Sequence, residues 1–190
     1  MTTISQNYTT QNDLLMNNLM EYYKNEICLN KMLKIITGEC KISLRIVDWF
    51  ATNYAKKYFT LFDINETDGS TKRFKVYTDY KLKLKAYSKR RFDPFCRWDR
   101  ISIPYKNGTC IETTIGQLNF FKWALENKVI DYIEENYDII EKDMNSRNST
   151  SKRKEQIVDN SKTRKKREEL SVSAIKSIKK EKVEIVVKFH

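Results

Sequence analysis

Two turn-forming dipeptides constrain the fold of this chain more than any other feature. Asp68-Gly69 separates the runs "YFTLFDI" and "RFKVYT", and Asn107-Gly108 separates "RISIP" and "TCIETT". Runs of aromatic and β-branched residues on both sides of such a dipeptide are typical of a β-hairpin. We therefore predict two antiparallel hairpins, one in each half of the chain.

The residues before the first hairpin have helical periodicity. Residues 12–37 carry apolar side chains at spacings of three and four, which predicts one helix or a broken pair of helices. Gly38 ends this segment, because glycine readily adopts the left-handed conformation found after a helix. Ser43 is placed to cap the next helix. The apolar face of that helix consists of Val47, Phe50, Ala51 and Tyr54.

After the second hairpin the pattern is helical again. Thr114 and Gln117 form a capping box before "IGQLNFFKWALEN", and "VIDYIEENYDIIEKDM" continues in helix until the apolar pattern ends at Asn145. The buried face of the first of these helices is predicted to contain Ile115, Leu118, Phe121 and Leu125. Helices and hairpins together predict an α+β domain over residues 12–145, in which a small antiparallel or mixed sheet of hairpins packs with helices. We expect residues 1–11 to be a disordered N-terminus.

The net charge of +11 is concentrated in two segments. Residues 72–100 hold eleven basic and three acidic residues, and residues 146–190 hold fourteen basic and six acidic residues. In contrast, residues 1–71 carry a net charge of −1 and residues 101–145 a net charge of −4. This asymmetry indicates a basic face and a basic tail rather than charge spread for solubility.

The first basic segment contains "YKLKLKAYSKRRFDPFCRW", residues 80–98. In its first part, apolar residues alternate with lysines, and this period of two favours a half-buried strand over residues 80–86. A helix beginning near Tyr80 is the alternative. It would put Leu84 and Tyr87 on the apolar side with Tyr80 but leave Leu82 among lysines.

The dipeptide Asp93-Pro94 is expected to end this element. A proline pushes the residue before it toward an extended conformation, so "FDPF" should form a turn. Phe92 and Phe95 can then fold back onto the core.

The second basic segment begins with "NSRNSTSKRKEQIVDNSKTRKKREE", in which Ile157 and Val158 are the only apolar residues. Such a stretch cannot bury itself, so we predict a basic flexible linker over residues 146–171. Its basic clusters at 152–153 and 164–167 are separated by ten residues, the spacing of a bipartite nuclear import signal. A phosphate-binding tail and a merely solvated linker are the alternatives.

The C-terminal segment, residues 172–190, ends in a predicted strand. Val183, Ile185, Val187 and Phe189 lie on one side of "KVEIVVKFH". A strand with no local partner must pair with a sheet edge, so we expect it to dock on this domain or on a partner.

Most catalytic chemistry is disfavoured by the residues that the chain lacks. The only histidine is His190, the last residue, whereas serine and cysteine nucleophiles usually need an imidazole partner held in place. Four glycines form no phosphate-binding loop, and four widely separated cysteines indicate buried reduced thiols rather than a zinc site or disulfides. We therefore predict a non-enzymatic protein with no catalytic residue, metal, cofactor or small-molecule substrate.

Nucleic-acid binding is the function that the basic segments favour. Lysine and arginine neutralise phosphates, and exposed aromatic rings stack on unpaired bases. The candidate residues of the first segment are Lys81, Lys83, Lys85, Tyr87, Lys89, Arg90, Arg91, Arg97, Trp98 and Arg100. Those of the linker are Lys152, Arg153, Lys154, Arg164, Lys165, Lys166 and Arg167. The alternative is that the aromatic residues belong to the core and the lysines form a solvated face.

Three stretches, "YSKRRFDPFCRW", "IETTIGQLNFFKWALENKVIDYI" and "LSVSAIKSIKKEKVEIVVKF", resemble uncharacterised proteins of the nucleocytoplasmic large DNA viruses, the mimivirus and phycodnavirus group. The resemblance covers residues 43–189 and implies a protein of a viral factory or virion, for which DNA and capsid are both candidate partners. It carries over no catalytic residue. The expected function is nucleic-acid binding, with DNA as the partner; the alternative is a minor structural component of the capsid or core that contacts other virion proteins.

The expected location follows from the apolar runs. The N-terminus has neither the basic nor the apolar region of a signal peptide, and no apolar run approaches the roughly 20 residues that span a bilayer. We therefore expect no membrane segment and no secretion. The resemblance places the chain in the cytoplasm or nucleus of a host cell, or in the virion.

Overall fold

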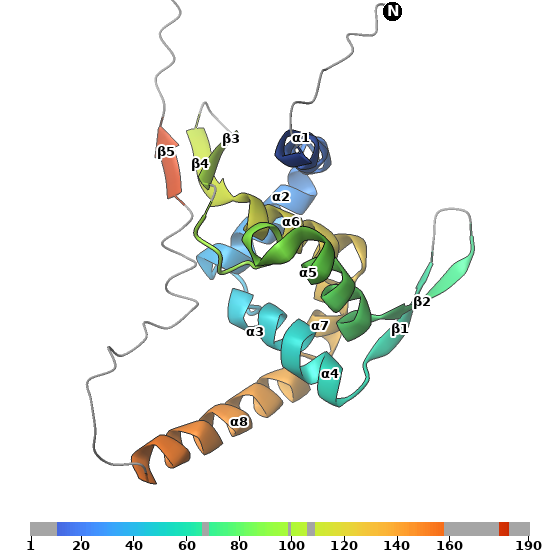
Figure 1. The fold of residues 1–190 in the computed structure, drawn as a ribbon, viewed down its shortest axis with the longest axis vertical. Helices are drawn as coiled ribbons and strands as arrows, with labels where there is room; N and C mark the ends of the chain where they lie inside the picture. The colour runs from blue at the N-terminus through green and yellow to red at the C-terminus, as the bar shows by residue number, and fades with distance from the viewer. Residues whose placement is uncertain (1–10, 66–68, 99, 106–108, 158–178, 183–190) are drawn as a thin grey trace, which may run out of the picture.

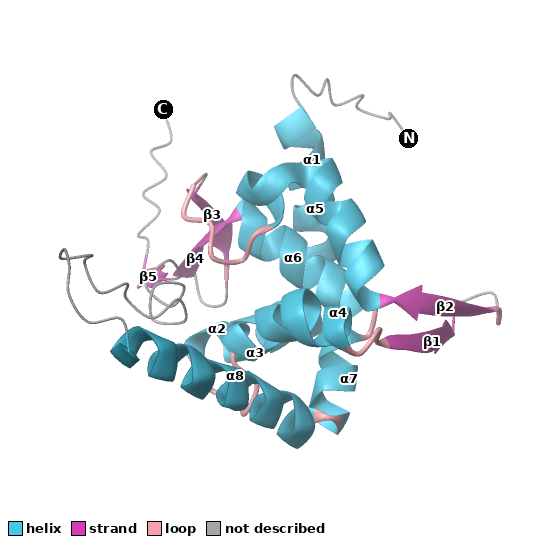
Figure 2. Cartoon of the chain, turned by 60° about the horizontal axis from the view of Figure 1, so that its bottom comes forward, coloured by secondary structure: helices cyan, strands magenta, loops and turns pink. Residues whose placement is uncertain are grey.

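The computed structural model describes residues 11–65, 69–98, 100–105, 109–157 and 179–182, and describes side chains as far as residue 147. Packed helices occupy the middle of the molecule (Figure 1). A two-stranded hairpin projects from one side, a small three-stranded sheet lies on the other side, and a long helix leads away from the body (Figures 1 and 2). The predicted α+β class is confirmed.

The N-terminal segment is a broken pair of helices, α1 (Gln11–Tyr23) and α2 (Glu26–Thr37). The side chain of Asn25 accepts a hydrogen bond from the Ile27 amide and caps α2. Gly38 ends α2 with φ of 77°, in the left-handed region that glycine adopts without steric cost. The helical periodicity and the glycine stop are both confirmed.

Helix α3 (Leu44–Trp49) continues through a π-helical turn, η1 (Phe50–Tyr54), into the short helix α4 (Ala55–Lys57). The hydroxyl of Ser43 accepts a hydrogen bond from the Ile46 amide, as expected of a cap. The face predicted to be apolar is buried throughout.

Both predicted hairpins form. Strands β1 (Leu61–Asn65) and β2 (Thr71–Lys75) pair with each other in an antiparallel arrangement. Strands β3 (Arg100–Pro104) and β4 (Thr109–Thr114) form the second hairpin. Of the turn dipeptides, Gly69 is described with φ of 83°, while Asp68 and Asn107-Gly108 lie outside the described residues.

Helix α5 (Val76–Phe92) replaces the strand predicted for residues 80–86, so that prediction is wrong. A helix buries Tyr80 and packs Leu84 and Tyr87 against the core, whereas Leu82 is left 60% exposed. Leucine, lysine and alanine also favour helix over strand. In a helix, residues that are two apart lie on different sides. The lysines that alternate with apolar residues in this segment therefore point in several directions instead of forming one face.

The end of α5 agrees with the prediction from Asp93-Pro94. Ser88 interrupts the helix with φ of 63°, and Asp93 then adopts an extended conformation. Phe92 is fully buried, and Phe95 packs against the core. This turn lies close to the next helix: a Cβ atom at Gly116 would lie 2.7 Å from the carbonyl oxygen of Asp93.

That next helix, α6 (Ile115–Glu126), is the centre of the core. The hydroxyl of Thr114 accepts a hydrogen bond of 3.2 Å from the Gln117 amide, which confirms the predicted cap. Burial extends beyond the predicted face, because α6 packs against α1, α2 and α5. Trp123, for example, donates its indole N–H to Asp79 of α5 at 2.7 Å. Of the four predicted residues, Leu125 is only half-buried.

Two helices follow, α7 (Val129–Glu135) and α8 (Tyr137–Ile157). Helix α8 extends past Asn145, which corrects the prediction of a flexible linker for residues 146–157. Once a helix has nucleated, adding lysine, arginine, glutamate and glutamine is inexpensive, even without an apolar face. Residues 158–178 lie outside the described part of the chain, and the division into domain, linker and C-terminal segment stays a prediction.

Strand β5 (Lys179–Lys182) pairs antiparallel with β4, so β4 lies between β3 and β5. A strand of the C-terminal segment therefore lies on the edge of this chain's own sheet. The alternating residues from Val183 to Phe189, on which the strand prediction rests, lie outside the described residues.

Candidate nucleic-acid interface

The candidate residues on α5 lie on different sides of the molecule, because a helix separates residues that are two apart. Lys81 and Lys85, one turn apart, line an outer surface together with Leu82. Lys83 and Tyr87 line an inner pocket between helices. The last group lines a hollow beyond the kink of α5: Lys89, Arg90, Arg97 and Trp98. The candidate residues of the first basic segment, which were expected to form one surface, are thus divided among three surfaces.

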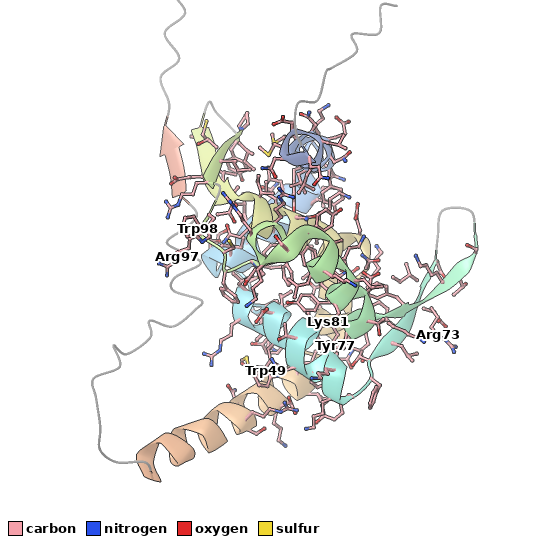
Figure 3. The ribbon with its side chains drawn as sticks, in the orientation of Figure 1. Trp49, Arg73, Tyr77, Lys81, Arg97 and Trp98 are labelled. Carbon is pink, nitrogen blue, oxygen red and sulfur yellow. The ribbon has the colours of Figure 1, made fainter. Side chains whose placement is uncertain are left out.

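The hollow beyond the kink brings basic and aromatic side chains together. It has a volume of about 670 Å³, and we call it the Trp98 hollow. Its lining consists of Lys89, Arg90, Asp93, Phe95, Cys96, Arg97 and Trp98. The indole of Trp98 is 70% exposed, and Figure 3 shows Arg97 beside it on the loop after α5. Asp93 is the single acid among the lining residues.

Local hydrogen bonds hold the loop that carries Trp98. The Asp93 carboxylate accepts from the Phe95 amide at 2.9 Å, and the Asp93 carbonyl accepts from the Cys96 amide at 3.0 Å. Both bonds tighten the turn at Pro94, and the Phe95 ring anchors it to the core. The loop therefore keeps Arg97 and Trp98 outside the core.

The half-buried carboxyl of Asp48 interacts with residues of the same turn. Burial raises the pKa of Asp48 to about 7, with a further rise from the Asp93 carboxylate and an opposing effect from the Lys89 ammonium. Asp48 belongs to α3, so a helix distant in sequence supplies an ionisable group that interacts with Asp93 and Lys89, two residues that line the Trp98 hollow.

The outer surface of α5 continues into a groove beside the β1–β2 hairpin. Two adjoining hollows of about 530 and 520 Å³ share Tyr77 and Thr78, and we call them together the lysine groove. Four lysines line it: Lys56, Lys75, Lys81 and Lys85. None of the described residues that line either hollow is acidic. In Figure 3, Tyr77 and Lys81 of α5 lie beside this hairpin.

Sequence reasoning missed half of this groove. Phe59, with φ of 48°, has a side chain that is 84% exposed, and the ammonium of Lys56 lies 5.6 Å from the centre of the Tyr77 ring. No pattern signals an exposed phenylalanine in a left-handed conformation, because that backbone region is uncommon for residues other than glycine. Lys75, in contrast, lies within the basic segment that the charge count identified.

Several candidate residues join none of the three surfaces. Arg91 is half-buried, and its carbonyl oxygen accepts a hydrogen bond from Asn119 at 2.9 Å. Arg100 forms an ion pair with Glu112 across β3 and β4 at 3.4 Å. Lys152, Arg153 and Lys154 lie on α8, but their side chains are outside the described part. Arg164, Lys165, Lys166 and Arg167 lie outside the described residues entirely.

Metal ligands are not clustered in the part of the chain that the structure describes, where no group of three or more histidine, cysteine or acidic residues could hold an ion. All four cysteines are free and half-buried, rather than fully buried as expected. No described helix is both long and apolar enough to cross a membrane.

The sequence of this chain was compared with protein families and with known proteins. The profile of a family of unknown function, DUF7197, matches residues 2–189. The chain belongs to this family. It is also 47% identical over 130 residues to an uncharacterized protein of Acanthamoeba polyphaga mimivirus, a match that covers 66% of this chain and 50% of the relative. The chain therefore spans about half the length of this relative.

The mimivirus match confirms the predicted relation to uncharacterised proteins of the large DNA viruses. No solved structure matches this chain.

Proposed function

We propose that this chain is a non-enzymatic nucleic-acid-binding protein of a large DNA virus, with DNA as its partner. The observation that carries the proposal is the Trp98 hollow, in which a 70% exposed indole lies with Lys89, Arg90 and Arg97. Monomeric proteins expose isolated apolar residues often, but an exposed tryptophan in a basic hollow combines the two groups that a single strand requires.

Each group has a separate role. The ammonium and guanidinium groups neutralise phosphates and release counterions, which makes binding dependent on salt. The Trp98 indole stacks on an unpaired base, an interaction worth about 1–3 kcal/mol that tolerates any sequence. A strand bound in this way is held by its backbone and by one or more of its bases, so single-stranded DNA should bind more tightly than duplex.

The lysine groove supports the proposal on a second part of α5. Its four lysines have no acidic neighbour among the described lining residues, so the groove attracts a polyanion. Lys81 and Lys85 lie on the same helix as Lys89, which lines the Trp98 hollow. A strand following α5 can thus contact both surfaces.

A structural role in the virion is the second candidate function. Phe59, Leu61 and Leu82 line the lysine groove and are 84%, 47% and 60% exposed, respectively. Exposed apolar side chains gathered in one groove are typical of contact with another protein. The two functions differ in their response to salt, because only phosphate binding releases counterions.

The test is fluorescence anisotropy with labelled single-stranded and duplex DNA over a range of salt concentrations. Lys89→Ala with Arg97→Ala should weaken binding and flatten the dependence of log K on log salt by about 0.7–0.9 for each phosphate that is no longer neutralised. Trp98→Ala should weaken binding of single-stranded DNA about 5- to 100-fold and leave the salt slope unchanged. A variant with Lys34→Ala and Lys142→Ala removes the same net charge from exposed positions on other helices and serves as the control.

Two outcomes would overturn the proposal. One is equal weakening by the control pair and by the Lys89 and Arg97 pair, because binding would then depend on net charge alone. The other is the absence of saturable binding at about 0.15 M salt, which would leave contact with virion proteins as the better account.

A further inference from the structure

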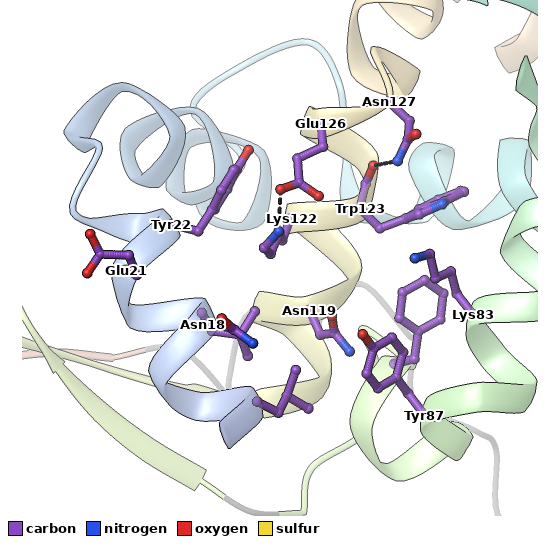
Figure 4. Close-up of a pocket in the computed structure, with 13 residues that line it drawn as sticks. Asn18, Glu21, Tyr22, Lys83, Tyr87, Asn119, Lys122, Trp123, Glu126 and Asn127 are labelled. Atoms are coloured by element: carbon purple, nitrogen blue, oxygen red, sulfur yellow. Dashed lines mark hydrogen bonds and ion pairs between the residues drawn. The ribbon is translucent and has the colours of Figure 1, made fainter. Parts of the chain in front are cut away.

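A pocket of about 460 Å³ lies between α1, α5 and α6, on a different side of α5 from the lysine groove (Figure 4). Figure 4 shows Asn18 and Tyr22 of α1 on one wall, Lys83 and Tyr87 of α5 on the other, and α6 between them. This volume is within the roughly 300–1,000 Å³ typical of small-molecule sites. We call it the inner pocket.

The α5 wall offers hydrogen-bond donors that the protein does not use. Lys83 and Tyr87 are one helical turn apart. Within the described part of the chain, the Lys83 ammonium has no ion pair and the Tyr87 hydroxyl has no hydrogen bond. Lys122 differs, because it is paired with Glu126 and lies 4.8 Å from the centre of the Tyr22 ring. Lys83 is therefore the lining cation that is available to an anionic group.

The α6 side of the pocket offers acceptors whose orientation is fixed. The amide nitrogen of Asn119 donates to the Arg91 carbonyl at 2.9 Å, and that of Asn127 donates to the Trp123 carbonyl at 2.8 Å. Each bond identifies the nitrogen end of the amide and leaves its oxygen free to accept. Both asparagines line the pocket, so an amino group of a ligand is the complementary donor for their oxygens.

Aromatic side chains complete the pocket. Tyr22, Tyr87 and Trp123 all contribute to its lining. The Tyr87 ring stacks on Phe92 with 6.1 Å between ring centres, which holds it in place on the wall. Fixed rings favour a flat, conjugated ligand over an aliphatic one, because stacking depends on a matching planar surface.

We propose that the inner pocket binds a nucleoside monophosphate unit whose base carries an exocyclic amino group. The phosphate is held by Lys83 and Tyr87, the base lies among the aromatic rings, and its amino group donates to Asn119 and Asn127. The unit can be a free nucleotide or an unpaired nucleotide of a strand. The proposal does not rest on the Trp98 hollow or the lysine groove, since it uses other residues.

The experiment is isothermal titration calorimetry of the full chain with AMP. Adenosine, inorganic phosphate and inosine monophosphate (IMP) are titrated separately, because they lack the phosphate, the nucleoside and the exocyclic amino group, respectively. We expect AMP to bind and each of the other three to bind at least about 10-fold more weakly, as the absence of one good hydrogen bond or charge interaction predicts. No heat with AMP up to about 1 mM would overturn the proposal, as would equal binding of IMP.

A matched pair of variants locates the site. Lys83→Ala should weaken AMP binding about 10- to 100-fold, whereas Lys81→Ala, two residues away on the outer surface, should leave it unchanged. Lys83→Arg keeps the charge and should retain most of the binding, which separates the effect of the missing charge from a failure to fold. Equal effects of Lys81→Ala and Lys83→Ala would show general charge attraction and overturn the assignment.

The source of the nucleotide unit is tested with a single-stranded oligonucleotide. If AMP competes with the strand and Lys83→Ala weakens both, the unit in the pocket is shared by the two ligands. If Trp98→Ala weakens the strand but not AMP, the inner pocket works independently of the Trp98 hollow. The two proposals can then fail or succeed separately.

Discussion

The carboxylate of Asp143 interacts with four other side chains, three through hydrogen bonds and that of Arg147 through an ion pair. The carboxylate accepts from Trp49 at 3.2 Å, Lys57 at 3.0 Å and Tyr58 at 3.1 Å, and the Asp143 side chain is only 7% exposed. These bonds connect α8 to α3 and to the end of α4. Burial alone would raise the pKa of Asp143, but the three hydrogen bonds and the charge of Arg147 hold it below its usual value.

Asp143→Ala should therefore destabilise the protein by about 1–3 kcal/mol at neutral pH, since it leaves several donors without their acceptor. Because the folded state lowers the pKa, the stabilisation is fully present above the ordinary value of about 3.9 and is lost as the pH falls through the folded value. Urea unfolding at pH 7 and pH 3 measures both effects. Asp138→Ala, at a side chain 88% exposed, should change stability by less than about 1 kcal/mol.

Asp48 should show the opposite dependence on pH. Burial first, and then Asp93, raise its pKa to about 7, so the folded state binds a proton more tightly than the unfolded state does. Stability should fall as the pH rises from about 4 to 7. Asp48→Asn removes the ionisation and should raise the melting temperature at pH 8 by about 2–4 °C per kcal/mol gained, with little change at pH 4. An unchanged melting temperature of the variant at pH 8 would contradict the raised pKa of Asp48.

At the scale of elements, α5 sets the arrangement of the candidate surfaces. Its inner side packs against α6, and its outer side faces the lysine groove. Leu82 and Leu84 are identical residues two positions apart, one 60% exposed and one packed against the core. In a half-buried strand they would share one face and respond alike to truncation.

The same substitution at both positions therefore tests the helix. Leu84→Ala should lower the free energy of unfolding by about 1–3 kcal/mol, whereas Leu82→Ala should change it by less than about 0.5 kcal/mol. Chemical denaturation measures both. Equal losses would contradict the helical arrangement, because only a strand places the two leucines on the same side.

At the scale of the whole molecule, β5 joins the far end of the chain to the middle of the sequence. It pairs with β4, which leads directly into α6 through Thr114. The sheet is small, so each strand contributes a large share of its pairing. Strand β5 of the C-terminal segment is thus connected through β4 to α6, the central helix of the core.

Truncation after residue 178 removes β5 and should lower the melting temperature, because the edge of β4 loses its partner. A decrease of about 2–4 °C corresponds to a loss of 1 kcal/mol in a chain of this size. Differential scanning calorimetry of the full and truncated chains makes the measurement. A truncated chain that melts at the same temperature would show that β5 adds nothing to the core.

The local elements could be predicted from the sequence because their signals are local. Capping residues such as Ser43 and Thr114 act on amides within the next turn, and Gly38 adopts a conformation that few other residues reach. Turn dipeptides between β-branched runs likewise predicted both hairpins. The basic segment was identified from composition alone, since charge is a property of the chain and not of its fold.

Only the tertiary structure decided what these elements do together. The alternation at Tyr80 to Ala86 fits a strand by local pattern, and packing against Phe120 and Trp123 made it a helix. That change separated Lys83 from Lys81 and Lys85, and divided one predicted surface into three. It also brought Asn119 and Asn127 beside Lys83 in the inner pocket. Such groupings join residues far apart in the chain, so they depend on how the helices pack and leave no pattern in the sequence.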